Sequence, residues 1–313
     1  MFYREFHPSG DLGRYVKCYW VLRSPANPFP GREPLIPAGT VELIWNIGAP
    51  YRRYPVGDAG VGELISGSHV VGECAGPFAI EQLGAIEHIA IRFRAGGLFP
   101  FVPIPGSELT DQAVGAGLIF GREASDIEEQ LAEATDDGVR IRILESMLRR
   151  WLVRAGVRPS TQAAEILTAT RLVDESRGRI SVAALSHHLG RDYRQLERRF
   201  LSVVGLTPKF YCRVTRFVSA FHGLQVNPAD SWTVRALDSG YYDQAHFIKE
   251  FTAFTGTTPS RFLASPKYIA AMLTASPESR NLSNSYKTKP RSGGRLQPDS
   301  QSKRGEHRWQ SRA

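Results

Sequence analysis

The chain has 313 residues, enough for two domains and a tail, and its 42% hydrophobic and 22% charged residues are ordinary values for a soluble protein. No apolar stretch approaches the roughly 18 residues that span a bilayer, and the N-terminus has no apolar signal segment, so we expect a cytoplasmic protein without a membrane partner. Cys18, Cys74 and Cys212 lack metal-ligand spacing and are typical of buried thiols in a reducing compartment.

The formal net charge of +8 is distributed unevenly. Residues 1–159 contain 16 Lys and Arg against 19 Asp and Glu, whereas residues 160–265 contain 13 against 9 and residues 280–313 contain 9 against 2. A basic C-terminal half favours a polyanionic partner such as nucleic acid. Residues 266–313 gather Ser, Arg, Lys, Gly and Pro without periodicity, which predicts a disordered basic tail; a basic arm that contacts phosphates is the alternative.

Residues 1–120 have the pattern of a β-rich domain. The apolar run VELIWNI, residues 41–47, lies between turn signals and predicts a strand. Ile89, Ile91 and Phe93 alternate with Ala90, Arg92 and Arg94, which predicts a half-buried strand. Gly and Pro recur every 8–12 residues, a spacing that favours short strands in a sandwich or small barrel over βαβ units.

Two candidate sites fall within this region. His69 and His88 with nearby glutamates (Glu42, Glu73, Glu81 or Glu87) could hold a metal, but no compact His-x-His or His-Glu-x-x-His grouping supports it, so we expect satisfied or surface histidines. Aromatic side chains could instead line a small-molecule pocket, although ordinary core packing is the preferred interpretation for each. These aromatic residues are Trp45, Phe78, Phe93, Phe99 and Phe101.

From Ser125 the hydrophobic period becomes helical. Ser125, with Glu128 three residues on, predicts an N-cap, and a break at residues 136–138 separates this helix from a second one that ends near Gly156. The two helices would cover the β-domain or pair with a second copy of the chain, and both alternatives stay open. The Arg-Pro-Ser stretch at 158–160 predicts the domain boundary.

Beyond this boundary the pattern is helix after helix. After a first helix with an apolar face from Ala163 to Val173, Ser181 caps a short helix that ends at Gly190, and Asp192 caps the next one over residues 193–203. A long helix over 208–224 follows. A second short helix at 232–239 then turns at Gly240, and a second capped helix spans 244–254. Helix, tight glycine turn and helix make a helix-turn-helix pattern.

The same landmarks occur twice, 51 residues apart. An apolar residue, Phe, Gly, Thr-Pro and an aromatic residue recur in order, from Leu196 to Tyr211 and again from Phe247 to Phe262. This repeat predicts two copies of one supersecondary unit.

Each copy presents polar side chains on the outer face of its second helix. Burial of Leu196 and Phe200 directs Arg194, Gln195, Glu197, Arg198 and Leu201 outward; burial of Phe247 and Phe251 does the same for Gln244, Ala245, His246, Ile248 and Lys249. Arg can bond guanine, Gln adenine and Glu cytosine in the major groove. We therefore predict a DNA interface made by Arg194, Gln195, Glu197, Arg198, Gln244, Ala245, His246 and Lys249.

Residues 160–265 resemble the DNA-binding domain of the AraC/XylS family of transcriptional regulators. The resemblance is carried by SGYYDQAHFIKEF at 239–251 with TG at 255–256 and TPSRF at 258–262, and by the looser match LGRDYRQLERRF at 189–200. It implies two helix-turn-helix units joined by a rigid helix, whose recognition helices enter successive major-groove segments on one face of DNA. One departure is Arg235, which precedes Ala236 where the family has an apolar residue inside the second unit.

The front of the chain resembles the N-terminal domain of a subset of AraC-type regulators. The matching strings are IPAGTVELIWNIG at 36–48, GAIEHIAIRFR at 84–94 and GGLFP at 96–100. The resemblance implies a cupin-like β-domain that senses an effector or dimerises.

The sequence therefore predicts an α+β protein of two domains: a β-rich domain with helices over 1–157, an all-α double helix-turn-helix domain over 158–265, and the tail over 266–313. The expected function is sequence-specific DNA binding in transcription, without enzymatic activity or cofactor. A cupin-type metal enzyme or a repair protein fused to a DNA-binding module is the alternative. Double-stranded DNA is the expected partner; RNA polymerase, a small-molecule effector and a second copy are further candidates.

Overall fold

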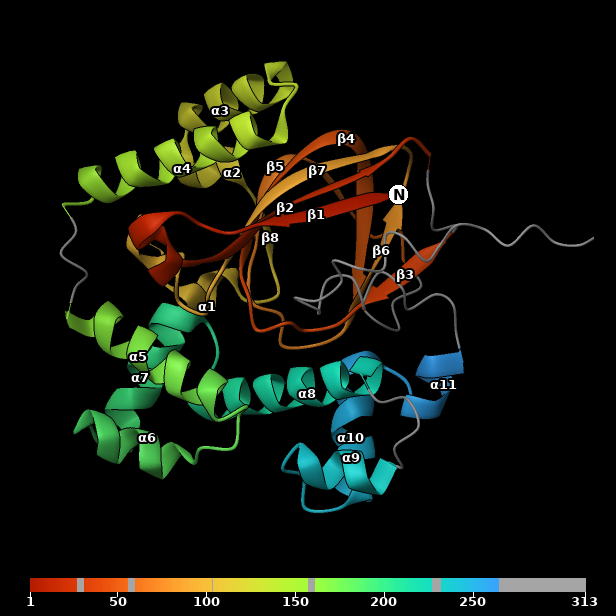
Figure 1. Ribbon diagram of the computed structural model, residues 1–313, viewed down its shortest axis with the longest axis vertical. Coiled ribbons are helices and arrows are strands. Elements are labelled where there is room, and N and C mark those ends of the chain that lie inside the picture. The colour runs from red at the N-terminus through yellow and green to blue at the C-terminus, as the bar shows by residue number, and fades with distance from the viewer. Residues whose placement is uncertain (27–30, 56–59, 103, 157–160, 227–231, 265–313) are drawn as a thin grey trace, which may run out of the picture.

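The computed structural model describes residues 1–26, 31–55, 60–102, 104–156, 161–226 and 232–264. It contains a sheet domain followed by a helical domain, as the sequence predicted (Figure 1). The boundary at 158–160 and the tail lie outside the described residues. None of the described helices is long and apolar enough to cross a membrane.

The N-terminal domain is one antiparallel sheet with short helices. Six of its strands follow the order β1-β2-β7-β4-β5-β8; β6 also pairs with β4, and β3 pairs with β6. The strands are β1 (Phe2–Phe6), β2 (Val16–Ser24), β3 (Arg32–Leu35), β4 (Glu42–Pro55), β5 (Glu63–Val71), β6 (Phe78–Gln82), β7 (Ile86–Phe93) and β8 (Ala113–Gly115). The 3₁₀ turns η1 (Gly10–Arg14) and η2 (Phe99–Phe101) and the helices α1 (Gly106–Leu109), α2 (Ala116–Phe120), α3 (Arg122–Glu133) and α4 (Asp137–Arg154) complete the domain.

The strand predicted at 41–47 is the first half of β4. The register of β4 shifts between Asn46 and Tyr51, so that its first half pairs with β7 and its second half with β6. Such an irregularity bends a strand. The bend lets one long strand turn the sheet back toward itself.

Both faces of β7 are buried between Ile89 and Phe93, and the expectation of a half-buried strand at 89–94 is therefore wrong. Ile89, Ile91 and Phe93 pack under α3 and α4, as period-2 alternation predicts. Ala90 and Arg92, on the opposite face, are also buried, at 0% and 4% exposure. The pattern did not show this because Arg92 is buried with carboxylate partners rather than exposed to water.

Helices α3 and α4 cover one face of the sheet (Figure 1). Of the two alternatives considered for them, the structure shows the first, in which they cover the β-domain. The prediction that Ser125 caps α3 is wrong. The helix begins four residues earlier, after Gly121, whose φ of 62° allows a sharp turn out of α2. The predicted break is confirmed: the side chain of Asp136 accepts a hydrogen bond from the Val139 amide and caps α4.

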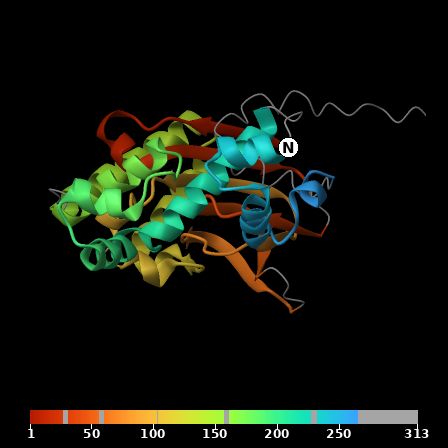
Figure 2. The same ribbon diagram turned by 90° about the horizontal axis from the view of Figure 1, so that it is seen from below.

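The C-terminal domain consists of seven helices in the described residues. Helices α6 and α7 lie at one end of the long helix α8, and α9, α10 and α11 lie at its other end (Figures 1 and 2). The helices are α5 (Thr161–Glu175), α6 (Val182–Leu189), α7 (Tyr193–Val204), α8 (Pro208–Val226), α9 (Trp232–Asp238), α10 (Gln244–Thr255) and α11 (Pro259–Ala264).

The two domains contact each other at the C-terminal end of α7. The Thr110 hydroxyl donates a hydrogen bond of 2.7 Å to the carbonyl of Gly205. Gly106 lies so close that a Cβ there would meet the Gly205 amide nitrogen at 2.7 Å, and Gly96 faces Val203. This contact leaves the N-terminal half of α7 turned away from the sheet domain.

Candidate nucleic-acid interface

The first helix-turn-helix unit is built by local signals. The Ser181 hydroxyl accepts from the Ala184 amide and begins α6, and Gly190 ends it in the left-handed conformation at φ 61°. The Asp192 carboxylate then accepts from the Gln195 amide at 2.8 Å and begins α7. These capping residues are the ones that the sequence predicted.

Helix α7 is amphipathic. Leu196 and Phe200 are completely buried in a cluster that also contains Leu185 of α6. Its outer face leaves four of the predicted reading residues accessible: Arg194, Gln195 and Arg198 are exposed, and Glu197 is partly buried.

The arginines of this unit divide into two kinds. Arg191 and Arg199 both bond Glu165 on α5, at 2.9 and 2.8 Å, and so fix α7 against the domain. Arg194 and Arg198 form no ion pair with any residue that the structure describes. Two guanidinium groups on the outer face of α7 therefore remain available to a partner, each with a planar set of donors suited to guanine or phosphate.

The second unit repeats this construction. The Asp243 carboxylate accepts from the His246 amide at 2.7 Å and begins α10, and Gly256 ends it at φ 72°. Phe247 and Phe251 are completely buried.

The outer face of α10 is less charged than that of α7. Ala245 and Lys249 are exposed, whereas Gln244 and His246 are partly buried, and the His246 ring packs at 5.3 Å against Tyr241. The prediction that Ile248 points outward is wrong, because its side chain is partly buried against the aromatic cluster of α8 and α10. Packing of the aromatic rings partly buries Ile248, although helical spacing placed this residue on the outer face of α10.

Ala236 takes the inward position of α9 and is completely buried. Arg235 is the residue at which the chain departs from the family pattern, and its side chain lies outside the described residues. The packing at this point of α9 is therefore described only by its neighbour Ala236.

Helix α8 holds the units at a fixed separation. At 1.5 Å per residue its 19 residues span about 28 Å. Arg213 of α8 bonds Glu250 of α10 at 2.7 Å, and Arg216 of α8 donates to the carbonyl of Gly178. This length is comparable with the roughly 34 Å between successive major-groove segments on one face of DNA.

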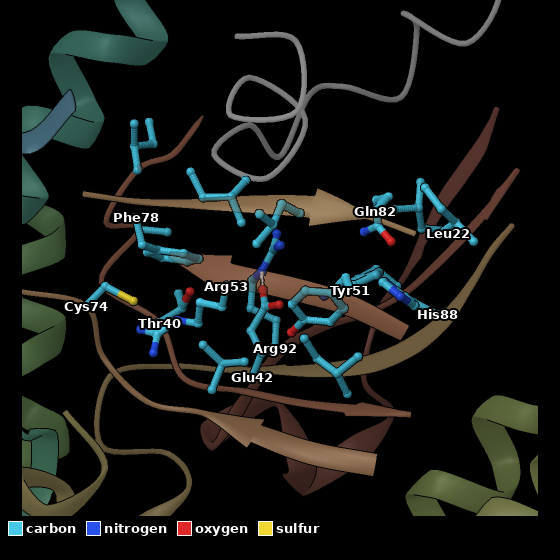
Figure 3. A pocket seen from close by; sticks show the side chains of 18 of the residues that line it. Leu22, Thr40, Glu42, Tyr51, Arg53, Cys74, Phe78, Gln82, His88 and Arg92 are labelled. Atoms are coloured by element: carbon cyan, nitrogen blue, oxygen red, sulfur yellow. Dashed lines mark hydrogen bonds and ion pairs between the residues drawn. The ribbon is translucent and has the colours of Figure 1, made fainter. Parts of the chain in front are cut away.

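The sheet domain contains a second candidate site, a cavity of about 140 Å³ on the face opposite α3 and α4 (Figure 3). Trp20, Glu42, His88 and Arg92 from three adjacent strands line it. From the sequence, His88 and Glu42 are candidates only for a metal site, and no local pattern groups them with Trp20. The sequence signal for this cavity is the pair of polar residues His88 and Arg92, which lie on the same face of the strand at 86–93.

Of the five aromatic residues weighed as pocket lining, Phe78 alone lines this cavity. Trp45, Phe93 and Phe101 pack in the core under the helices, and Phe99 packs against the cluster around α7. Core packing, the preferred interpretation, is therefore confirmed for four of them.

The described residues contain no group of three His, Cys, Asp or Glu side chains placed to hold a metal. His69 bonds the Tyr51 hydroxyl at 2.8 Å, and Glu42 bonds Arg92 at 2.5 Å. Burial raises the pKa of the Cys18, Cys74 and Cys212 thiols to about 11, 12 and 11, so these thiols stay protonated near neutrality.

Residues 185–265 match the model of a helix-turn-helix domain, and residues 4–115 match a domain of unknown function, DUF6597. No curated protein matches the chain. Among solved structures, ToxT from Vibrio cholerae is 11% identical with a TM-score of 0.46, covering 79% of this chain and 97% of that one. ToxT bound to an unsaturated fatty acid is 12% identical with a TM-score of 0.41, covering 78% and 94%.

The helix-turn-helix match and the paired units define the chain as a DNA-binding transcriptional regulator. Its C-terminal domain is an AraC-type helix-turn-helix domain, which confirms what the motif at 239–251 predicted.

Proposed function

We propose that α7 and α10 enter successive major-groove segments on one face of DNA and that α7 supplies most of the base specificity. The observation that carries this proposal is that the exposed guanidinium groups of Arg194 and Arg198, on the N-terminal half of α7, form no ion pair within the described part of the chain. Gln195 and Glu197 lie beside them as candidate readers of adenine and cytosine. On α10, Gln244, Ala245 and His246 offer fewer donors, and Lys249 serves as a phosphate contact.

The test is the affinity of single variants for a cognate site and for random DNA. Arg194→Ala and Arg198→Ala are each expected to weaken cognate binding by about 1–3 kcal/mol, with a much smaller loss on random DNA. The matched control is Arg171→Ala, which removes an exposed arginine of α5 whose nearest ion-pair oxygen lies 3.7 Å away in the same helix. Equal losses on both DNAs would show that these arginines contact phosphate and read no bases.

We further propose that the cavity in the sheet domain is an effector site that acts on the DNA-binding domain through residues 35–40. Leu35, Ile36, Ala38 and Thr40 line the cavity. Ile36 also packs into the aromatic cluster of α8, α10 and α11, where Phe217 and Phe251 are completely buried. One short segment thus forms a cavity wall on one side and a contact with the second helix-turn-helix unit on the other.

The proposed role in transcription also bears on the location of the protein, on catalysis and on its further partners. The protein is a cytoplasmic regulator without catalytic activity, and RNA polymerase and a second copy of the chain are its further partners. Metal analysis of the purified protein tests the absence of catalysis: stoichiometric iron, zinc or manganese would restore the enzyme alternative. Sedimentation of the free protein tests self-association.

A further inference from the structure

We infer that the cavity binds an uncharged, mainly apolar molecule about the size of one benzene ring. This molecule carries an oxygen atom able to accept hydrogen bonds. This inference rests on the proposed effector role of the cavity and specifies the chemistry of its ligand.

The size of the cavity limits the ligand. A volume of about 140 Å³ is close to that of apolar protein cavities that bind benzene. The walls suit such a ring: Trp20 and His88 lie with ring centroids 6.3 Å apart. The ring centroid of Tyr51 lies 5.9 Å from that of His88, and Figure 3 shows these two side chains. Apolar side chains, among them Ile44 and Phe78, make up most of the remaining lining.

The charged groups around the cavity are already compensated. Arg92 pairs with Glu42 at 2.5 Å and with Glu5 at 3.6 Å. Arg53 has Glu63 at 3.9 Å and donates to the carbonyl of Asp111 at 2.8 Å. Two guanidinium groups thus face three carboxylates, so an anionic ligand would meet no excess of positive charge and would have to displace Glu42 from Arg92.

The neutral polar groups are less well satisfied. Trp20 Nε1 and His88 Nε2 are buried and have no hydrogen-bond partner among the described residues. Among the charged groups, Arg53 Nε also has no hydrogen-bond partner in the described residues, although the guanidinium charge is compensated. Burial lowers the pKa of His88 to about 3, with a smaller contribution from the nearby His69, so its imidazole is neutral and can donate one hydrogen bond. A buried donor without a partner is unfavourable, and one ligand oxygen would supply the missing acceptor.

The experiment compares three probes of one size on the full-length protein by saturation-transfer NMR and calorimetry: acetophenone, benzoate and ethylbenzene. Acetophenone is expected to bind about tenfold more tightly than either of the others, since it alone is neutral and carries an acceptor. Trp20→Phe is expected to weaken acetophenone about tenfold and to leave ethylbenzene unchanged. The control is Trp45→Phe, a buried tryptophan on the opposite face of the same sheet.

Three results would overturn the inference. Tightest binding of benzoate would show that the ligand is an acid that pairs with a guanidinium group of the cavity, and equal binding of acetophenone and ethylbenzene would show that the donors are not used. Binding of none of the probes, by a protein that still binds DNA, would exclude this class of ligand. Because DNA affinity is measured on the same samples, each result leaves the DNA-reading proposal to its own test.

Discussion

At the scale of single residues, ion pairing separates the arginines that hold the structure from those that can meet DNA. Glu165 engages Arg191 and Arg199, and Glu250 engages Arg213. Arg194 and Arg198 have no such carboxylate partner among the described residues. Helical spacing predicted that Arg194 and Arg198 point outward, but it could not predict which arginines are paired, because Glu165 lies 26 residues before Arg191.

Glu73 gives a residue-scale prediction on pH. Burial raises its pKa to about 8, with repulsion from Asp174 adding to the effect, so the folded protein holds this carboxyl group protonated at pH values where the unfolded chain ionises it. The folded state therefore binds more protons, and its free energy of unfolding should fall as pH rises from about 4.5 to 8, by at most about 1.4 kcal/mol per pH unit from this group.

The variant Glu73→Gln removes that titration. Thermal or urea unfolding at several pH values should show that the variant gains stability over the wild type as pH rises through this window, and that the two curves run parallel above it. Stability differences that do not change with pH would contradict the assignment of a protonated Glu73.

At the scale of elements, capping determines where the recognition helices begin. Asp192 and Asp243 each accept a hydrogen bond from the amide three residues on, at 2.8 and 2.7 Å. These caps and the glycine turns could be predicted because they depend on adjacent residues. The start of α3 could not, since the chain turns at Gly121 and passes over the better capping residue, Ser125.

Removal of the first cap should destabilise the helix that carries the reading residues. Asp192→Ala is expected to lower the free energy of unfolding by about 1 kcal/mol, because an amide of the first turn loses its acceptor. Asp192→Asn keeps an acceptor oxygen and is the matched control, expected to stay within a few tenths of a kcal/mol. Denaturant unfolding measures both, and equal losses in the two variants would show that the carboxylate charge, rather than the hydrogen bond, stabilises the helix.

At the scale of the whole molecule, the segment at 35–40 joins the cavity to the DNA-binding domain. Alternation along the strands predicted their inward-facing side chains, but not that the sheet bends far enough to enclose a second buried face. The contact of Ile36 with α8 could not be predicted either, because it joins residues about 180 positions apart in the sequence. Long-range contacts of this kind depend on how the domains pack and leave no local pattern.

Ile36→Ala tests this connection. It is expected to lower the free energy of unfolding by about 2–4 kcal/mol and to speed amide hydrogen exchange in α8 around Val214 and Phe217. Leu22→Ala is the control, since Leu22 lines the same cavity but packs with β-sheet residues instead of the α8 cluster. Equal exchange in α8 for the two variants would contradict a specific connection through Ile36.

We propose that the recognition helices at the two ends of α8, a helix about 28 Å long, read two separate DNA segments. Selection of binding sites from random DNA tests it most directly, with the wild type, Arg198→Ala and Gln244→Ala in parallel. We predict two preferred segments about one helical turn apart, with Arg198→Ala relaxing base preference in one and Gln244→Ala, more weakly, in the other. A single preferred segment, or two variants that relax the same positions, would contradict it.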